Sequence, residues 1–203
     1  MPPYILAQCL GALLASVTIY LEYHSALTNY GTKCCNGTAY LIPPAGPCNV
    51  ASVWTTFPQD FESNLDGMLD QVIGTGLLLV GIFAVGDDVQ WKPALDASPF
   101  AKAAAVAILV VAIGMCFGFN TGYAINPARD LAPRIFLSLA GWGSAVFEIG
   151  GGWYWFLVPC VGPVLGGLLG STLFQVCVGF HHPQQDPSHA YQGKPYISPR
   201  HCE

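Results

Sequence analysis

Four long apolar stretches constrain this chain more than any other feature of its sequence. A helix needs about 20 mainly apolar residues to cross the hydrocarbon of a bilayer. The stretches run roughly over residues 4–21, 68–85, 103–119 and 153–180. Of the 203 residues, 53% are hydrophobic and only 9% are charged, whereas about a quarter are charged in a soluble domain. We therefore predict an all-α membrane protein, a helical bundle with four transmembrane helices.

The first stretch lies where a targeting segment would lie. No basic residue precedes it, and it is longer than the apolar core of a cleaved signal peptide, so we expect it to remain as a span. Cleavage after Ala15 or Ser16 is the alternative.

Composition and motifs exclude several classes of function. The net charge of -5 is not gathered in one run, and no basic surface for nucleic acid is present. The five histidines lie in connections or in the C-terminal segment without a paired nucleophile, and the cysteines lack metal-ligand spacing. We expect no enzyme activity, no cofactor, no metal and no nucleic-acid partner.

The basic residues predict which way the chain faces. Lys92 and Lys102 flank the connection between the second and third stretches, and Lys194 and Arg200 lie in the C-terminal segment, whereas the first connection holds only Lys33. Cytoplasmic segments are enriched in Lys and Arg. We therefore expect both termini in the cytosol, a membrane domain over residues 1–182 and a disordered cytosolic tail over residues 183–203.

The first connection, which this orientation places outside, carries two possible modifications. Asn36 begins an Asn-Gly-Thr sequon, an acceptor sequence for N-glycosylation. Cys48 shares the connection with Cys34 and Cys35, and could form a disulfide with either of them. Whether Asn36 is glycosylated and whether a disulfide forms both stay open.

Small residues recur at every fourth position in three of the stretches, and this spacing places them on one helix face, where backbones can approach closely. They are Ala7, Gly11 and Ala15; Gly114 and Gly118; and Gly162, Gly166 and Gly170. We expect all three stripes to be packing surfaces. Two polar residues lie in the second stretch: we expect Asp70 to reach the membrane interface, and Gln71 to hydrogen-bond either irregular backbone nearby or another helix.

A polar segment follows the third stretch, where Asn126-Pro127 is a typical helix start and Gly141 a typical stop. The helix between them has about 14 residues and spans roughly 21 Å, too short to cross the hydrocarbon. We predict a re-entrant half-helix over about residues 126–140. A capped amphipathic helix in a surface loop is the alternative.

The N-terminus of such a half-helix would lie within the membrane. Unpaired N–H groups and partial positive charge gather there, and they disfavour cations while orienting the lone pairs of water or an alcohol. Arg129 would add a fixed positive charge and several directed donors. The segment therefore predicts the lining of a pore for neutral molecules.

These residues resemble a known family. The run Asn126-Pro127-Ala128-Arg129-Asp130 is similar to the second signature of the major intrinsic proteins, or aquaporins, and an Asp after the Arg resembles the aquaglyceroporin branch. Gly114 falls at the position that is Gly in glycerol channels and typically His in water-only channels. The resemblance implies that Gly114, Tyr123 and Arg129 are filter residues and that Asn126 is a central donor. It also matches Arg134 to the basic residue of the glycerol-channel pattern, which would support the pore loop together with Gln71.

The resemblance implies a passive channel for glycerol, water and other small neutral solutes, assembled as a homo-tetramer in the plasma membrane. The family is built from two inverted repeats, each with an Asn-Pro-Ala half-helix, and this chain has one such motif. We therefore expect a truncated bundle that lacks the first two spans and the first half-helix, and that conducts poorly alone. One alternative is a non-conducting form that associates with full-length subunits and modulates them. A four-span adhesion or structural protein is the other.

Overall fold

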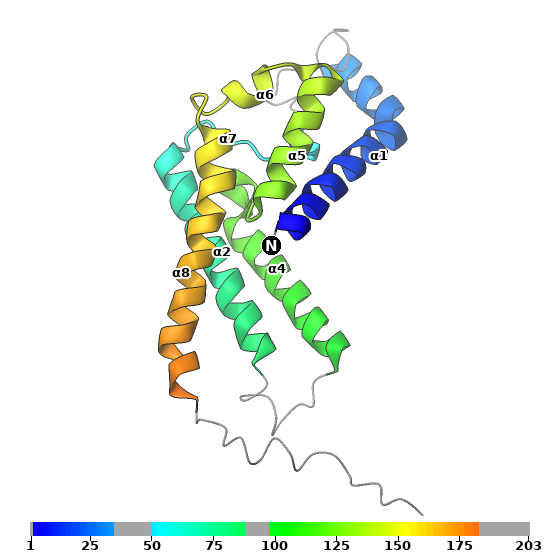
Figure 1. The fold of residues 1–203 in the computed structure, drawn as a ribbon. Helices are drawn as coiled ribbons and strands as arrows, with labels where there is room; N and C mark the ends of the chain where they lie inside the picture. The colour runs from blue at the N-terminus through cyan, green and yellow to red at the C-terminus, as the bar shows by residue number, and fades with distance from the viewer. Residues whose placement is uncertain (1, 35–49, 88–97, 183–203) are drawn as a thin grey trace, which may run out of the picture.

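The structure, a computed structural model, describes residues 2–34, 50–87 and 98–182 of the chain (Figure 1). Its principal helices are α1 (Pro2–Cys34), α2 (Asn64–Gly86), α4 (Pro99–Thr121), α5 (Pro127–Leu137) and α8 (Gly162–Cys177). Shorter elements are α6 (Ala145–Glu148), α7 (Tyr154–Phe156), the 3-10 turns Ala51–Val53 and Gly179–His181, and the π-helical turns Ser138–Trp142 and Leu157–Val161. These ranges contain no strand, and the predicted all-α class is confirmed.

Four helical segments of the described residues are long and apolar enough to cross a membrane: Pro2–Tyr30, Asn64–Gly86, Pro99–Thr121 and Tyr154–His181. They contain the four apolar stretches of the sequence. The first helix continues well beyond residue 21, because residues 22–30 include neither Gly nor Pro and so contain no strong breaker. The last span changes to a π-helical turn around Pro159, whose nitrogen carries no hydrogen for the helical ladder.

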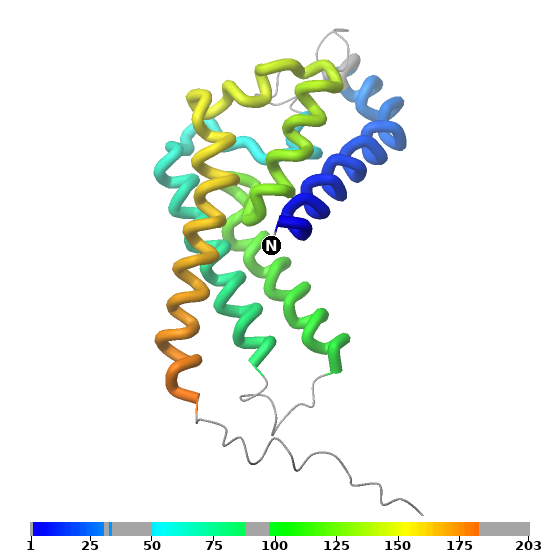
Figure 2. The backbone as a smooth tube through the Cα atoms, viewed as in Figure 1, coloured from blue at the N-terminus to red at the C-terminus, as the bar shows by residue number. Residues whose placement is uncertain are grey.

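Helices α2 and α8 lie side by side along their length (Figures 1 and 2). A Cβ atom added to Gly166 would lie 2.5 Å from the carbonyl oxygen of Val72, and one added to Gly170 would overlap the backbone of Gly76. The backbones of the two helices therefore approach too closely for any side chain. This confirms the packing role expected for the stripe in the last span.

The other two stripes behave differently. A Cβ atom added to Gly11 would meet nothing within 4 Å, and Ala7 and Ala15 are exposed. The expected packing is thus wrong for α1 in the part of the chain that the structure describes, because α1 contacts α5 through a different face, on which Ser16 is buried. The side chain of Tyr123, which lies in a loop, packs against Gly114 and Gly118 in place of another helix.

The main apolar core lies near one end of the bundle, where α1, α5, α6 and the segment before α2 meet. It consists of the buried residues Val50, Ala51, Trp54, Leu137, Trp142 and Val146. Tyr20 and Phe136 pack against it, with ring centroids 5.7 Å apart. The opposite end holds the last residues of α2, the first residues of α4 and the end of α8 (Figure 1). The core thus anchors α5 at its C-terminal end.

The close contact between α2 and α8 should make the stability of the protein sensitive to a side chain added at Gly166. Replacing Gly166 by Val should lower the free energy of unfolding by about 1–3 kcal/mol, because the new side chain has to push two backbones apart. The matched control is Gly167→Val, since a Cβ atom there would lie 3.9 Å from the side chain of Leu79. Thermal unfolding in detergent micelles, followed by tryptophan fluorescence, measures both variants. Equal shifts of Tm would contradict this account of the packing.

Candidate functional site

Helix α5 is a half-helix. It has 11 residues, which corresponds to about 16 Å. It follows the end of α4 and packs against α1 and the π-helical turn Leu157–Val161, and its last residues reach the core end of the bundle (Figure 1). The helix gives way to a π-helical turn at Ser138, and Gly141, with a φ of 122°, turns the chain where the sequence predicts a stop.

Asn126 caps this helix from its inner end. Its Oδ1 accepts a hydrogen bond from the backbone N–H of Ala128 at 3.0 Å, and Pro127 occupies the first turn, where its missing N–H is no loss. The side-chain oxygen is therefore engaged within the helix. The Nδ2 group donates to Oε1 of Gln8 on α1 at 3.2 Å, and both side chains are accessible. Nothing in the sequence indicates this pairing of Gln8 with Asn126, because 118 residues separate them.

The loop that leads into Asn126 has an unusual backbone. Tyr123 and Ile125 have φ angles of 40° and 43°, in the left-handed region that non-glycine residues, and β-branched ones above all, adopt at a cost. Gly122, with a φ of 75°, ends α4 in the same region. Surrounding contacts therefore have to hold this loop in place.

Gln71 supplies one of those contacts. Its Oε1 accepts from the backbone N–H of Ile125 at 2.7 Å, and its Nε2 donates to Oγ1 of Thr121 at 2.7 Å. Gln71 thus hydrogen-bonds both to irregular backbone, at Ile125, and to another helix, at Thr121. The sequence predicts these two roles as alternatives, and Gln71 has both. The neighbouring Asp70 does not reach the membrane interface. Its side chain is buried and accepts from Thr121 at 2.6 Å, so that expectation is wrong, because a partner inside the protein satisfies the carboxylate.

Tyr123 lies over the two glycines of α4. A Cβ atom at Gly114 would lie 2.8 Å from Cζ of the ring, and one at Gly118 would lie 3.4 Å from Cδ1. The absence of a side chain at position 114 therefore fixes where the ring can lie. Any larger residue there would displace Tyr123.

Arg129 lies one turn into α5 and remains exposed. Its Nη1 donates to the carbonyl oxygen of Trp54 at 3.2 Å, and the indole Nε1 of Trp54 donates in turn to the carbonyl oxygen of Ser16 at 3.1 Å. A cavity of about 310 Å³ between α1 and α5 is lined by Arg129, Pro133 and Trp54, among others. Trp54 thus orients the arginine, a role that nothing in its local sequence indicates.

Asp130 and Arg134 form a buried ion pair on the opposite side of the same helix. Nη2 and Nε of Arg134 donate to one carboxylate oxygen of Asp130 at 2.8 and 3.0 Å. The other oxygen accepts from the side chain of Thr55 at 2.8 Å and from the backbone N–H of Thr56 at 2.8 Å. The guanidinium also donates to the carbonyl oxygens of Val146 and Thr56. The pair therefore ties α5 to the segment before α2 and to α6.

A carboxyl group outside the spans has a shifted pKa. Burial raises the pKa of Glu62, in the turn before α2, and the negative charges of Asp66 and Asp70 raise it further. The raised pKa means that Glu62 becomes protonated at a higher pH than an exposed glutamate would.

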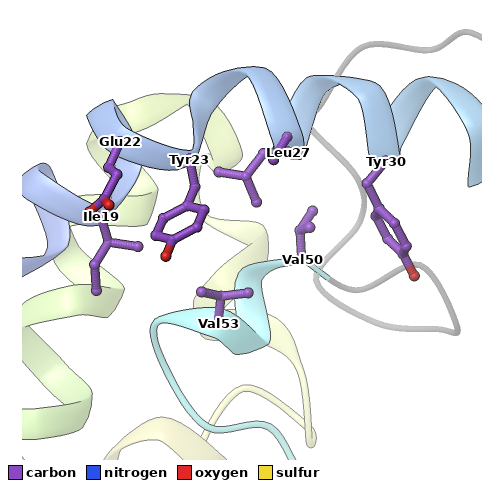
Figure 3. Close-up of a pocket in the computed structure, with 8 residues that line it drawn as sticks. Ile19, Glu22, Tyr23, Leu27, Tyr30, Val50 and Val53 are labelled. Atoms are coloured by element: carbon purple, nitrogen blue, oxygen red, sulfur yellow. The ribbon is translucent and has the colours of Figure 1, made fainter.

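A larger groove of about 880 Å³ runs along the C-terminal half of α1. Tyr23 and Leu27 of α1 point toward Val50 and Val53 across it (Figure 3). Among the described residues that line this groove, none is a predicted site residue.

Several predicted positions lie outside the described residues. They are Asn36, Cys35 and Cys48, together with the side chain of Cys34. In the described ranges Cys9, Cys116, Cys160 and Cys177 have free thiols, and no group of three potential metal ligands occurs there.

Comparison with known proteins decides the family. A family model described as major intrinsic protein matches residues 1–174. The chain belongs to the major intrinsic protein family. This confirms the resemblance seen in the signature around Asn126, and because members of the family are channels, the chain is not an enzyme.

The similar proteins include aquaglyceroporin-type relatives. The chain is 41% identical to human aquaporin-10 over 184 residues, which cover 91% of this chain and 57% of the relative. It is 39% identical to aquaporin-7 of Rattus norvegicus, over 85% of this chain and 60% of the relative. The aquaglyceroporin from Plasmodium falciparum has a similar structure, with a TM-score of 0.70 and 25% identity over 88% of this chain and 65% of that one. The chain thus spans little more than half the length of the curated relatives it matches.

The buried ion pair between Asp130 and Arg134 should contribute strongly to the stability of the protein. Asp130→Asn should destabilise the protein by about 3–5 kcal/mol, because it leaves the guanidinium of Arg134 buried without a counter-charge. Glu148→Gln is the matched control, since this carboxylate is exposed and bonds only to Ser144 among the contacts seen. Chemical unfolding in mixed micelles measures both. If the two variants unfold alike, the pair does not hold α5 in place.

Proposed function

We propose that this chain forms one wall of a channel for water, glycerol and other small neutral solutes. The observation that supports this most directly is the N-terminus of α5, which lies within the bundle with Asn126 as its cap. Partial positive charge at a helix N-terminus disfavours protons and other cations, while the amide of Asn126 can donate to oxygen. A site of this kind passes neutral hydroxylic molecules and holds back ions.

Three residues form the proposed filter. Gly114 leaves space, the ring of Tyr123 offers an apolar wall for CH groups, and Arg129 presents directed donors to hydroxyl groups. Glycerol carries CH groups on one side of its carbon backbone and hydroxyl groups that can turn to the other, so it matches both surfaces. The contact between Gly114 and the ring of Tyr123 supports glycerol as a permeant most directly. A His side chain at position 114 could not share this space with the ring.

The relatives support the same permeants. The solved structure that resembles this chain is named an aquaglyceroporin, and the curated relatives are named aquaporins. By extension we propose that Pro127 and Ala128 shape the turn at the pore, and that Asp130, Arg134 and Gln71 support it from behind.

We further propose a multi-pass protein of the plasma membrane with both termini in the cytosol. The distribution of Lys and Arg supports this orientation, and the end of α2 and the start of α4 lie together at one end of the bundle (Figure 1). A homo-tetramer is the expected assembly of the complete channel, by resemblance to the family.

A polypeptide of these 203 residues alone would present one pore wall. Gln8 and Arg129 are exposed, as are Ala7 and Ala15 on α1, and a Cβ atom added to Gly11 between them would meet nothing within 4 Å. We therefore propose that such a polypeptide conducts poorly by itself. Association with full-length subunits, which it would modulate without conducting, is the second candidate function, and the open face of α1 favours it. An adhesion protein has no evident use for the half-helix.

The conduction of the isolated polypeptide can be tested directly. Purified and reconstituted in liposomes, it should reswell in a glycerol gradient no faster than protein-free liposomes, because unpaired N–H groups facing lipid cost several kcal/mol each and the pore wall collapses. Stopped-flow light scattering measures the rate, with the aquaglyceroporin from Plasmodium falciparum as the positive control. Fast reswelling that Arg129→Ala abolishes would establish a pore made by this polypeptide alone.

The filter is tested in a complete channel, made by joining this chain to the first repeat of human aquaporin-10. Gly114→His should lower glycerol flux by about tenfold or more, and lower water flux much less, because the imidazole competes with the Tyr123 ring for space. Gly118→Ala is the control, since its Cβ atom would make ordinary contact with the ring. The readout is the ratio of the two fluxes in one vesicle preparation. An unchanged ratio would show that position 114 is not part of the filter.

A further inference from the structure

The side chain of Gln71 can serve the loop in only one of its two orientations. An amide group presents an oxygen, which accepts, and an NH2 group, which donates. The backbone N–H of Ile125 lies 2.7 Å from Oε1 of Gln71 and can only donate. If the amide turned over, two donors would face each other at a buried position. Some neighbour therefore has to select the correct orientation.

Thr121 transmits that selection. Its hydroxyl has one hydrogen, which it donates to Oδ2 of Asp70 at 2.6 Å. With that hydrogen engaged, Oγ1 of Thr121 can only accept, and it accepts from Nε2 of Gln71 at 2.7 Å. The Oε1 atom of Gln71 must then face Ile125. Nε2 of Gln71 also has a longer contact, at 3.4 Å, with the same oxygen of Asp70. The hydrogen bonds thus run in one direction, from Ile125 through Gln71 to Asp70, mainly by way of Thr121.

Burial makes this direction matter. Gln71 is 1% exposed, Thr121 0% and Asp70 8%, so water is not at hand to replace a lost partner. In such surroundings a polar group left unpaired costs far more than at a surface. The acceptor at the end of the chain of hydrogen bonds therefore determines the polarity of every bond before it.

We propose that Asp70 is a positioning residue for the pore loop: as the terminal acceptor, it sets the orientation of the Gln71 amide and so holds the backbone of Ile125. Ile125 is a β-branched residue with a φ of 43°, and it directly precedes Asn126. Releasing its N–H lets this strained turn relax and moves the helix cap. Asp70 itself does not face the permeant. The consequence for permeation rests on the function proposed above, whereas the geometry of the loop does not.

Hydrogen exchange at the backbone amide of Ile125 tests the proposal without any flux measurement. The full chain in lipid nanodiscs is followed by NMR, together with three changes at Asp70 and Gln71. Asp70→Leu removes the acceptor at similar volume and should speed exchange at Ile125 about tenfold, the effect of weakening one hydrogen bond. Asp70→Asn keeps an acceptor oxygen and should retain most of the protection.

The decisive variant is Asp70→Leu combined with Gln71→Glu. A carboxylate at position 71 accepts from Ile125 and from Thr121 at once and has no wrong orientation, so protection of Ile125 should return. A role of Asp70 in packing alone would not be rescued in this way. Asp66→Leu, which removes an exposed carboxylate one turn earlier on α2, is the control and should leave exchange at Ile125 unchanged.

Two outcomes would overturn the proposal: unchanged exchange at Ile125 in Asp70→Leu, or exchange as fast in the double variant as in the single one. If Asp70→Leu does not fold, Thr121→Val provides the same test, since it removes the hydroxyl that transmits the selection. It should likewise speed exchange at Ile125 while amides in the middle of α8 keep their protection. Unchanged exchange in this variant would also overturn the proposal.

Discussion

The fold depends on ending a short helix, α5, among helices that are apolar enough to cross a membrane. A helix N-terminus leaves several backbone N–H groups without partners, and within the hydrocarbon no water is present to satisfy them. Two features meet this requirement at α5, since Pro127 has no N–H and Asn126 accepts from Ala128. A third satisfies the loop before it, where the side chain of Gln71 accepts from Ile125. The polar segment interrupts the apolar sequence because the protein itself has to supply these partners.

The two ends of α5 are fixed by different physical means. At the inner end, side-chain hydrogen bonds from α2 and α4, which end at the carboxylate of Asp70, hold a loop whose backbone is strained at Tyr123 and Ile125. At the outer end, the buried pair of Asp130 and Arg134 ties the helix to the segment before α2, next to the aromatic core. A short helix has few contacts along its own length. It therefore takes its position from both of its ends.

The sequence predicts those parts of the structure that depend on neighbouring residues. The four spans follow from local composition, and the start of α5 follows from Asn126-Pro127, because capping acts within one turn. The contacts of Asp130 with Thr56 and of Arg129 with Trp54 could not be found this way, since these partners lie 74 and 75 residues earlier in the chain and are brought near only by the fold. The stripe around Gly11 shows a related limit. Small residues on one face make close approach possible, but they do not show whether another helix is there.

The polar side chains around α5 differ in how freely their hydrogen bonds can exchange. Asp130, Arg134 and Gln71 are almost fully buried, and every bond they make is to the protein. Asn126 and Arg129 are accessible. Among the described residues, their side-chain N–H groups have one long contact each, at 3.2 Å, to Gln8 and to the carbonyl of Trp54 respectively. A molecule moving through a pore has to gain and lose hydrogen bonds at little cost, which tightly held donors cannot offer. In the proposed channel the buried groups therefore fix the geometry, and the two accessible donors, held loosely in known directions, are the ones left to meet the permeant.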